Sequence, residues 1–378
     1  MKTLKLECDR DALVKALGLV GDAIDNKSTI PILAYVLLRA KGKTVEVVGT
    51  DLITKIIHTI EARVIGRGSV EEFTLPWHDL RAALKNCTDP TLRIEVKDLK
   101  AEIRCGNVSL TFEALPPQDF PTTLSDMKLP TVYAVNAEDL GQIIKTVRHA
   151  ISEEEARFYL HGAFFHCLKN GVLRLVTTDG HRLVVDEIAA PSGLTPEALP
   201  IIVPAETLYA VQHHCKAIPG SVIVSSGLDG IRFDFGYGCM VLSKRIDGTY
   251  PDYSRVIPNG DGNKCRLLAT IDADAFDDAL RQLPPGKGKF KQRAVKLTFK
   301  NKKLTLSQQA TDDAPGANLS VPCDCLGPAF EIGFNPRYLR DALAVLGNQI
   351  GLAFADKDSP VLMVSGEMPQ VVIMPMRV

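Results

Sequence analysis

An aspartate and a histidine that could act together in acid–base chemistry lie two positions apart, in the segment Thr177–Leu183 (Thr-Thr-Asp-Gly-His-Arg-Leu). A carboxylate at Asp179 beside the imidazole of His181 is a pair that a hydrolase can use to move a proton. No nucleophile motif, His-Glu-x-x-His helix or glycine-rich phosphate loop accompanies the pair in this sequence. Because Asp-Gly is also a common turn signal, we interpret the segment as a turn and the chain as a protein without catalytic activity.

Nine cysteines are the other residues that could bind a metal or form covalent bonds. Their number is odd, their positions are scattered, and no Cys-x-x-Cys motif occurs. Cys323 and Cys325 lack the second pair of ligands that a zinc site needs. We therefore expect free and mostly buried thiols in a reducing cytoplasm, with no metal and no cofactor.

The segment Pro284–Arg293 (Pro-Pro-Gly-Lys-Gly-Lys-Phe-Lys-Gln-Arg) is strongly basic. It does not match a phosphate-binding loop, because Phe290 follows the Gly-Lys pair and no strand–loop–helix frame surrounds it. We expect an exposed surface loop, with contact to DNA as the alternative. The whole chain is nearly neutral, with 44 basic and 45 acidic residues, so any contact with DNA must come from basic side chains gathered on one face.

The 378 residues are 46% hydrophobic and 24% charged, which is typical of a globular protein with two or three domains. The first ten residues carry charge where a signal peptide is apolar. No apolar run approaches the roughly 20 residues of a membrane helix. We expect a soluble, cytoplasmic protein without membrane contact.

Three segments with helical spacing of apolar residues divide the chain into near thirds. Asn136 and Asp272 are suited to cap the second and third of these helices. The apolar positions are Leu13, Leu17, Val20 and Ile24; Leu140, Ile143, Ile144 and Val147; and Phe276, Ala279, Leu280 and Leu283.

Further elements follow each helix in the same order. Thr-Asp pairs begin at Thr50, Thr178 and Thr311, at the end of β-rich segments. Next comes a strand that runs into a second short helix, which in the third copy is capped by Asn335 with Pro336 at its first position. The expected closing strands are Val108–Phe112, Cys239–Lys244 and Val371–Met376.

Four elements that recur in one order predict three tandem copies of an α+β domain, each with two helices and antiparallel sheets. The expected domains are 1–125, 130–254 and 258–378. Exposed sheet edges at the two ends could be removed by joining a second copy head to tail into a ring. A monomeric array with blunted ends is the alternative that the repeat leaves open.

Several longer motifs resemble those of the bacterial sliding clamps, the β subunits of DNA polymerase III. They are Thr177–Leu183, Arg157–Leu160, Asp247–Tyr253, Glu331–Asn335 and Val372–Val378. The resemblance implies a homodimeric ring of six similar domains whose helices line a hole for duplex DNA. It also implies a non-catalytic processivity factor in DNA replication, which needs no cofactor.

The resemblance further implies a peptide-docking pocket between the second and third domains. Its expected partners are the polymerase catalytic subunit, the clamp loader and other proteins that carry a clamp-binding motif. The matching residues are Leu160, Thr178, Gly180, His181, Arg182, Leu183, Pro251, Val256, Asn335, Tyr338, Ile350, Val372, Met374, Pro375, Met376 and Arg377.

Two further sets of residues follow from the same resemblance. The DNA-facing set is Lys27, Arg157, Phe158 and Tyr159. The dimer interface sets Leu110 and Phe112 of the first domain against Leu280 and Leu283 of the partner's third domain. The alternative function is a clamp-like interaction scaffold, or a divergent extra clamp that does not serve the main replicase.

Overall fold

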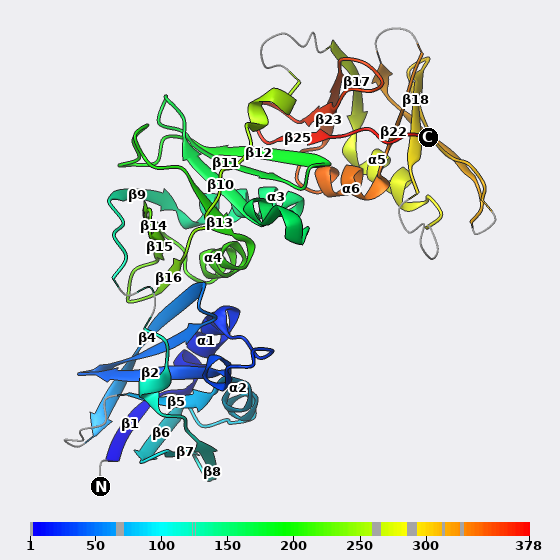
Figure 1. The fold of residues 1–378 in the computed structure, drawn as a ribbon. Coiled ribbons are helices and arrows are strands. Elements are labelled where there is room, and N and C mark those ends of the chain that lie inside the picture. The colour runs from blue at the N-terminus through cyan, green and yellow to red at the C-terminus, as the bar shows by residue number, and fades with distance from the viewer. Residues whose placement is uncertain are drawn as a thin grey trace. The chain divides into compact units, whose positions relative to one another are not determined.

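The computed structural model describes residues 3–65, 72–122, 124, 126–258, 266–285, 293–311, 314–325 and 329–378 (Figure 1). The chain divides into two units by its internal contacts. Unit 1 contains Met1–Gln142, Lys169–Gly171 and Ala190–Ile246, and unit 2 contains Ile143–Leu168, Val172–Ala189 and Asp247–Val378. The boundary between these units passes through the second repeat, so the three domain ranges expected from the sequence stay a prediction.

The expected threefold repeat is confirmed by the order of the elements. The first repeat contains β1 (Thr3–Asp9), α1 (Arg10–Val20), β2 (Tyr35–Lys41), β3 (Thr44–Thr50), β4 (Thr54–Ile65), β5 (Glu72–Pro76), α2 (Trp77–Lys85), β6 (Thr91–Lys97), β7 (Lys100–Cys105) and β8 (Val108–Glu113).

The second repeat has the same order. It contains β9 (Thr131–Asn136), α3 (Ala137–Val147), β10 (Gly162–Cys167), β11 (Leu173–Thr178), β12 (Arg182–Ile188), β13 (Ile201–Pro204), α4 (Ala205–Ala217), β14 (Ser221–Gly227), β15 (Gly230–Asp234) and β16 (Met240–Ser243). Three short 3₁₀ helices belong to it as well, η4 (Arg148–Ala150), η5 (Glu155–Leu160) and η6 (Tyr253–Val256).

The third repeat follows the pattern with one added two-residue strand, β21. It contains β17 (Arg266–Asp272), α5 (Ala273–Arg281), β18 (Val295–Lys300), β19 (Lys303–Gln308), β20 (Ala317–Pro322), β21 (Asp324–Cys325), β22 (Phe330–Phe334), α6 (Pro336–Leu343), β23 (Gln349–Phe354), β24 (Val361–Val364) and β25 (Gln370–Ile373).

Side-chain caps start the helices where the sequence predicts them. Asp272 accepts a hydrogen bond from the Ala275 amide (2.9 Å), and Asn136 accepts one from the Glu138 amide (2.8 Å). Asn335 accepts from the Arg337 amide (3.0 Å) with Pro336 at the first helical position. Each cap satisfies an amide that has no partner within its helix.

Several expected element ends are wrong. α1 ends at Val20, and Ile24 is extended and lies beyond the helix; the Trp77 indole packs so closely on Gly21 that a Cβ there would lie 2.4 Å from the ring. α5 ends at Arg281, which leaves Leu283 outside the helix. The last strand ends at Ile373 rather than Met376, because the chain turns away to other partners.

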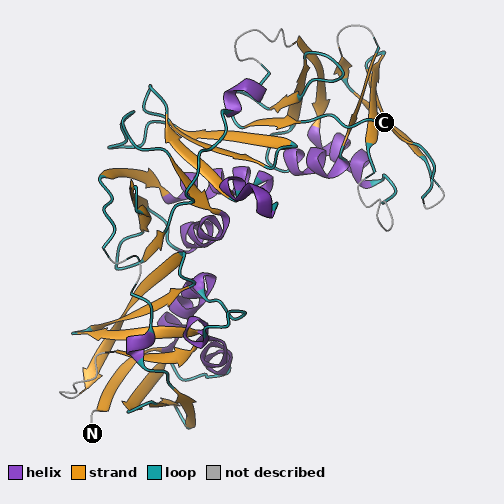
Figure 2. Ribbon diagram, in the orientation of Figure 1, coloured by secondary structure: helices purple, strands orange, loops and turns teal. Residues whose placement is uncertain are grey.

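Each repeat builds an antiparallel sheet with one strand order. In the first repeat the order is β4-β3-β2-β5, in the third it is β20-β19-β18-β22, and in the second β12 pairs with β11 and β11 with β10. In unit 1, α1, α2 and α4 lie on one side of the strands, and α1 packs against β4 (Figure 2).

Strands also join successive repeats, and each of these joints lies inside one unit. In unit 1, β16 pairs antiparallel with β4, with Ser243 opposite Thr54. In unit 2, β25 pairs antiparallel with β12, with Ile373 opposite Arg182. We call these the first junction and the second junction.

Eight cysteines lie in the described part of the chain. All eight are free thiols and six are buried. Cys265 and residues 286–292 of the basic segment lie outside the described residues. Among the described helices, none is long and apolar enough to cross a membrane.

Candidate functional site

The segment Thr177–Leu183 forms the turn that the sequence predicts, between β11 and β12. The Asp179 carboxylate accepts hydrogen bonds from the amides of His181 (2.9 Å) and Arg182 (3.0 Å). The Thr178 hydroxyl donates to the Arg182 carbonyl (2.7 Å) and accepts from the Gly180 amide (3.1 Å). Asp179 is therefore used to build the turn, and its carboxylate makes no side-chain pair with His181 that would resemble an acid–base couple.

Gly180 is favoured at the tip of this turn. Its φ of +86° lies in the left-handed region that favours glycine. An added Cβ would also lie 2.5 Å from a guanidinium nitrogen of Arg157. The Asp-Gly signal in the sequence thus marks a turn whose backbone conformation favours glycine.

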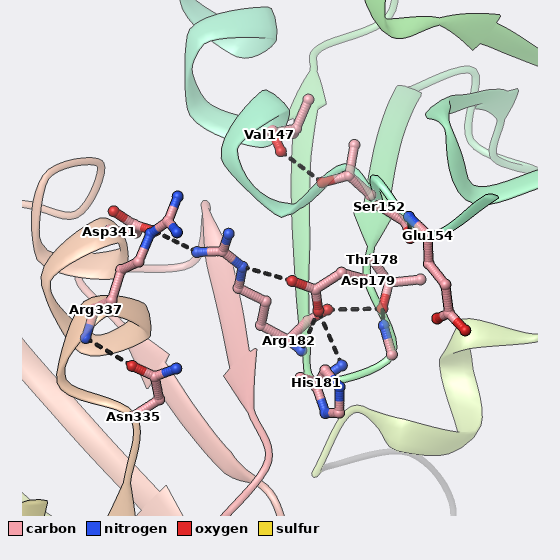
Figure 3. A network of polar contacts seen from close by, with 12 residues as sticks. Val147, Ser152, Glu154, Thr178, Asp179, His181, Arg182, Asn335, Arg337 and Asp341 are labelled. Carbon is pink, nitrogen blue, oxygen red and sulfur yellow. Dashed lines mark hydrogen bonds and ion pairs between the residues drawn. The ribbon is translucent and has the colours of Figure 1, made fainter. Parts of the chain in front are cut away.

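Arg182 is the centre of the site, and its side chain is only 7% exposed. Its Nε donates to Asp179 Oδ2 (3.0 Å), and its NH1 donates to Asp341 Oδ2 (2.5 Å) (Figure 3). Its guanidinium carbon lies 4.5 Å from the centre of the Tyr338 ring. A buried charge needs such pairing, because an unpaired one would cost several kcal/mol.

α6 brings two residues of the third repeat to this arginine. Tyr338 and Asp341 are three residues apart, so they lie on one face of the helix. The His181 ring is nearly parallel to that of Tyr338, at 19° and 6.4 Å between centres. Burial raises the pKa of Tyr338 above its ordinary value.

His149 is a further titratable group close to this network. Burial, followed by the nearby charge of Arg182, lowers the pKa of His149 to about 4. Its imidazole is therefore neutral at physiological pH, and the positive charge near the turn belongs to the arginines.

The C-terminal tail, residues 374–378, leaves β25 and lies against the turn and β22. The Met374 amide donates to the His181 carbonyl (2.8 Å), and the Met376 amide donates to the Gly333 carbonyl (2.8 Å). A Cβ at Gly333 would lie 2.4 Å from the Met376 carbonyl oxygen. Met374 and Met376 remain 39% and 37% exposed, so two thioether side chains are presented to solvent beside the turn.

The segment that follows β16 and ends with η6 is fastened to the sheet of unit 2. The Tyr250 hydroxyl donates to the Val176 carbonyl (3.3 Å). The Tyr253 hydroxyl lies 2.8 Å from Nε2 of His166 and 3.2 Å from NH1 of Arg174. Pro251 and Val256, in the same segment, stay exposed.

The residues expected in a peptide pocket fall into two groups. Seven are buried and support the turn, the helix and the strands: Leu160, Thr178, Arg182, Leu183, Asn335, Ile350 and Val372. The others are exposed or half-buried: Gly180, His181, Pro251, Val256, Tyr338, Met374, Pro375, Met376 and Arg377. The contacts above join the turn, α6 and the tail into one surface, which we call the docking surface.

Asp179 and Asp341 are functional candidates that the expected pocket set lacks. Two facts could have pointed to these aspartates. A buried arginine needs counter-ions, and Asp341 lies three residues after Tyr338 on the same helix. Sequence spacing alone does not show that Arg182 is buried, so the second carboxylate becomes evident only in the fold.

The residues expected to face DNA occupy two separate places. Arg157, Phe158 and Tyr159 lie in η5, where Phe158 is 53% exposed and meets Tyr159 edge to face at 5.8 Å. Arg157 pairs with Glu154 at 3.2 Å. Lys27 is an exposed residue of unit 1. Their expected role in DNA contact stays a prediction.

The residues expected at a dimer interface also lie in two places. Leu110 and Phe112 are half-buried on β8, which ends its sheet in unit 1. Leu280 and Leu283 are buried in unit 2 and line, with Leu343, a cavity of about 800 Å³ beside α5 and α6. Among the described residues, no group of three or more His, Cys, Asp or Glu side chains is arranged to hold a metal ion.

Comparison with protein families gives three matches that together cover almost all of the chain. Residues 4–125 match the model of the DNA polymerase III beta subunit N-terminal domain, residues 134–252 the central domain, and residues 254–377 the C-terminal domain. The three matches follow one another in the order of the three repeats.

Individual relatives agree with the family models. The chain is 35% identical to the beta sliding clamp of Caulobacter vibrioides, over 99% of this chain and 100% of the relative, and 30% identical to that of Pseudomonas putida, over 97% and 98%. The crystal structure of the Caulobacter crescentus clamp, with polyethylene glycol at a putative beta-motif tethering region, matches with a TM-score of 0.91 at 35% identity and full coverage of both chains. A Bartonella birtlesii sliding clamp bound to griselimycin matches with a TM-score of 0.92 at 30% identity, also with full coverage of both.

Proposed function

Because the chain belongs to the family of the DNA polymerase III beta subunit, we propose that two copies form a ring that encircles duplex DNA and tethers the replicative polymerase. The family is a non-catalytic subunit, and this assignment is the reason to regard the chain as a non-enzyme. We further propose that the protein acts in the cytoplasm as three domains, 1–125, 130–254 and 258–378.

The main support for a dimeric ring is that the same strand pairing occurs at both junctions. β16 pairs with β4, and β25 pairs with β12. In both cases the last strand of a repeat pairs with the fourth strand of the repeat before it. By position in the repeat, β8 corresponds to β16 and β25, and β20 corresponds to β4 and β12. Both β8 and β20 stand at the end of their described sheets.

A third junction of the same kind would therefore pair β8 of one copy with β20 of a second copy. A free strand edge is a template for such pairing, and two equivalent contacts close a dimeric ring. Leu110 and Phe112 of β8 would then meet the partner copy near the cavity that Leu280 and Leu283 line.

The mass in solution tests this dimer. Sedimentation equilibrium should give about twice 41.2 kDa across a dilution series. Phe112→Asp should give monomers, because a charge in an apolar contact is costly. Thr111→Asp, at the exposed neighbouring position of β8, should remain dimeric. A dimer for Phe112→Asp would contradict the proposed contact, and a wild-type monomer at all concentrations would favour the scaffold function.

The near-neutral charge suits a protein that slides along DNA. A strongly basic lining would hold phosphates tightly and give a steep salt dependence, whereas a topological link needs only light contacts from Lys27, Arg157, Phe158 and Tyr159. After a clamp loader places the protein on a nicked circular plasmid, cutting the plasmid should release it. Equal retention on circular and linear DNA would contradict encirclement.

We also propose that the docking surface binds a short hydrophobic motif carried by the polymerase catalytic subunit, the clamp loader and other partners. Exposed Met374, Met376 and Val256 offer adaptable apolar contact, and Met side chains suit varied partners. Deletion of Met374–Val378 should abolish binding of a clamp-motif peptide while the dimer persists. Unchanged peptide affinity in the truncated protein would refute this assignment.

A further inference from the structure

Asp341 is the one acidic residue of α6 that contacts Arg182, and none of the expected site sets includes it. Its Oδ2 accepts a hydrogen bond from Arg182 NH1 at 2.5 Å and lies 3.8 Å from Arg337 Nε. The Asp341 side chain is 31% exposed, whereas that of Arg182 is 7% exposed. The charge that Asp341 meets is therefore largely out of water.

Two carboxylates hold two different nitrogens of the same guanidinium. Asp179 accepts from Nε at 3.0 Å and Asp341 accepts from NH1 at 2.5 Å. A guanidinium is planar, so contacts at two nitrogens fix the orientation of the whole group. That fixed group lies 4.5 Å from the centre of the Tyr338 ring, within the range of a cation–π contact.

The same arginine is continuous with the other parts of the docking surface. Its amide is bonded to Asp179 within the turn that carries His181 (Figure 3). Its backbone is paired with Ile373, directly before Met374. A shift of the guanidinium would therefore change its contact with Tyr338 and its pair with Asp179, whose carboxylate holds the turn.

We propose that Asp341 is a positioning residue of the docking surface. By fixing Arg182 from the third repeat, it holds Tyr338 and the His181 turn in the arrangement that a partner peptide meets. This inference rests on the proposed docking function. Asp341 itself need not touch the peptide, because it acts through Arg182.

The first test measures the affinity of the full-length protein for a fluorescein-labelled clamp-motif peptide by fluorescence anisotropy. Asp341→Asn, which keeps the shape but removes the charge, should weaken binding about tenfold. Asp341→Glu, which keeps the charge but shifts it by one methylene, should weaken binding about two- to fourfold, since position matters as well as charge. The matched control is Glu46→Gln, which removes a carboxylate from the half-buried pair with Arg39 on β2 and β3 of unit 1. That control should bind as the wild type does.

The second test separates positioning from general loosening. In an Arg182→Met background, Asp341→Asn should cause no further loss of peptide affinity, because its route of action is already gone. A further tenfold loss in that background would overturn the inference. Wild-type peptide affinity in both Asp341→Asn and Asp341→Glu would also overturn the inference. If Asp341→Asn does not fold, wild-type affinity of Asp341→Glu alone overturns it.

Peptide binding by the wild-type protein distinguishes failure of the docking function from failure of the role of Asp341. If it does not bind the peptide at all, the docking function and the role of Asp341 both fail. If it binds and the Asp341 variants bind equally well, only the role of Asp341 fails.

Discussion

The first and second junctions share one backbone design but carry different side chains. The hydroxyls of Thr50 and Thr178 donate to the carbonyls of Thr54 and Arg182, at 2.8 Å and 2.7 Å. Asp51, like Asp179, accepts from two amides of its own turn. The carbonyls of Ile53 and His181 each accept from the residue after the joining strand, Lys244 or Met374. The repeat thus preserves the turn wherever two repeats join.

The difference lies at two positions of that turn. The first is Leu52 against Gly180, both with positive φ, at +78° and +86°. Leu52 accepts a conformation unfavourable to side chains and packs against the core cluster of Ile32, Leu33, Leu37, Val48 and Phe120. Gly180 has no side chain, and the guanidinium of Arg157 lies where a Cβ of residue 180 would be.

The second difference is Thr54 against Arg182. At the first junction, Thr54 bonds Thr207 (2.9 Å) and Thr207 bonds Ser243 (2.6 Å), so small hydroxyls close the seam. At the second junction a guanidinium, two carboxylates and an aromatic ring occupy the equivalent place. One backbone therefore forms a seam closed by hydroxyls in unit 1 and carries the proposed docking surface in unit 2.

The largest expected effect comes from removing the residue that distinguishes the junctions. Arg182→Met leaves Asp179 and Asp341 without their buried partner, which costs on the order of 3 kcal/mol in the free energy of unfolding. Far-UV circular dichroism in urea should show this loss. Trp77, the single tryptophan, lies in unit 1, so its fluorescence midpoint should not move. An equal shift of both signals would mean that the junctions are not independent.

The next effect concerns a feature that both units share. Burial lowers the pKa of His58 and His214 in unit 1, and of His149 and His166 in unit 2, to about 4 in each case. The unfolded chain has a histidine pKa of about 6.5 and so binds protons more readily. Stability should therefore be full above pH 6.5 and should fall as the pH drops towards 4.

His214 gives the sharpest test of this acid sensitivity. Its Nδ1 donates to the Ala210 carbonyl (2.8 Å), and its Nε2 is buried without a hydrogen-bond partner among the described residues. Its share of the loss at pH 5 is about 2 kcal/mol. Urea unfolding of His214→Phe at pH 7 and pH 5, followed by Trp77 fluorescence, should show a smaller drop than the wild type. An identical drop would contradict the prediction.

The smallest effect is expected at the closed seam. Thr207→Val removes the hydroxyl that joins Thr54 and Ser243, at a cost of about 1 kcal/mol for the partners left unsatisfied. The Trp77 midpoint in urea should fall, while the affinity for a clamp-motif peptide should not change. A loss of peptide affinity would show that the first junction also takes part in docking.

Local patterns made much of the fold predictable from the sequence. The apolar spacing of Leu140–Val147 and the caps at Asn136, Asp272 and Asn335 act within a few residues, so they can be recognised in the chain itself. The Asp179-Gly180 turn was predictable for the same reason. The resemblance supplied the expected set of pocket residues, which stays a prediction.

Features that depend on distant contacts could not be predicted. α1 stops before Ile24 where Trp77, far along the chain, packs against Gly21. The tail leaves its strand at Met374 because it bonds His181 and Gly333. Asp341 becomes important only because Arg182, 159 residues earlier, is buried beside it. Each of these depends on a partner that sequence spacing does not reveal.

We expect partner peptides to dock at the second junction and not at the first. Hydrogen exchange of the full-length protein, with and without a saturating clamp-motif peptide, tests it most directly. We expect slower exchange in residues 178–183, 335–341 and 374–377, and no change in residues 50–54, 203–207 and 243–246. Protection at the first junction, or none at the second, would contradict this account.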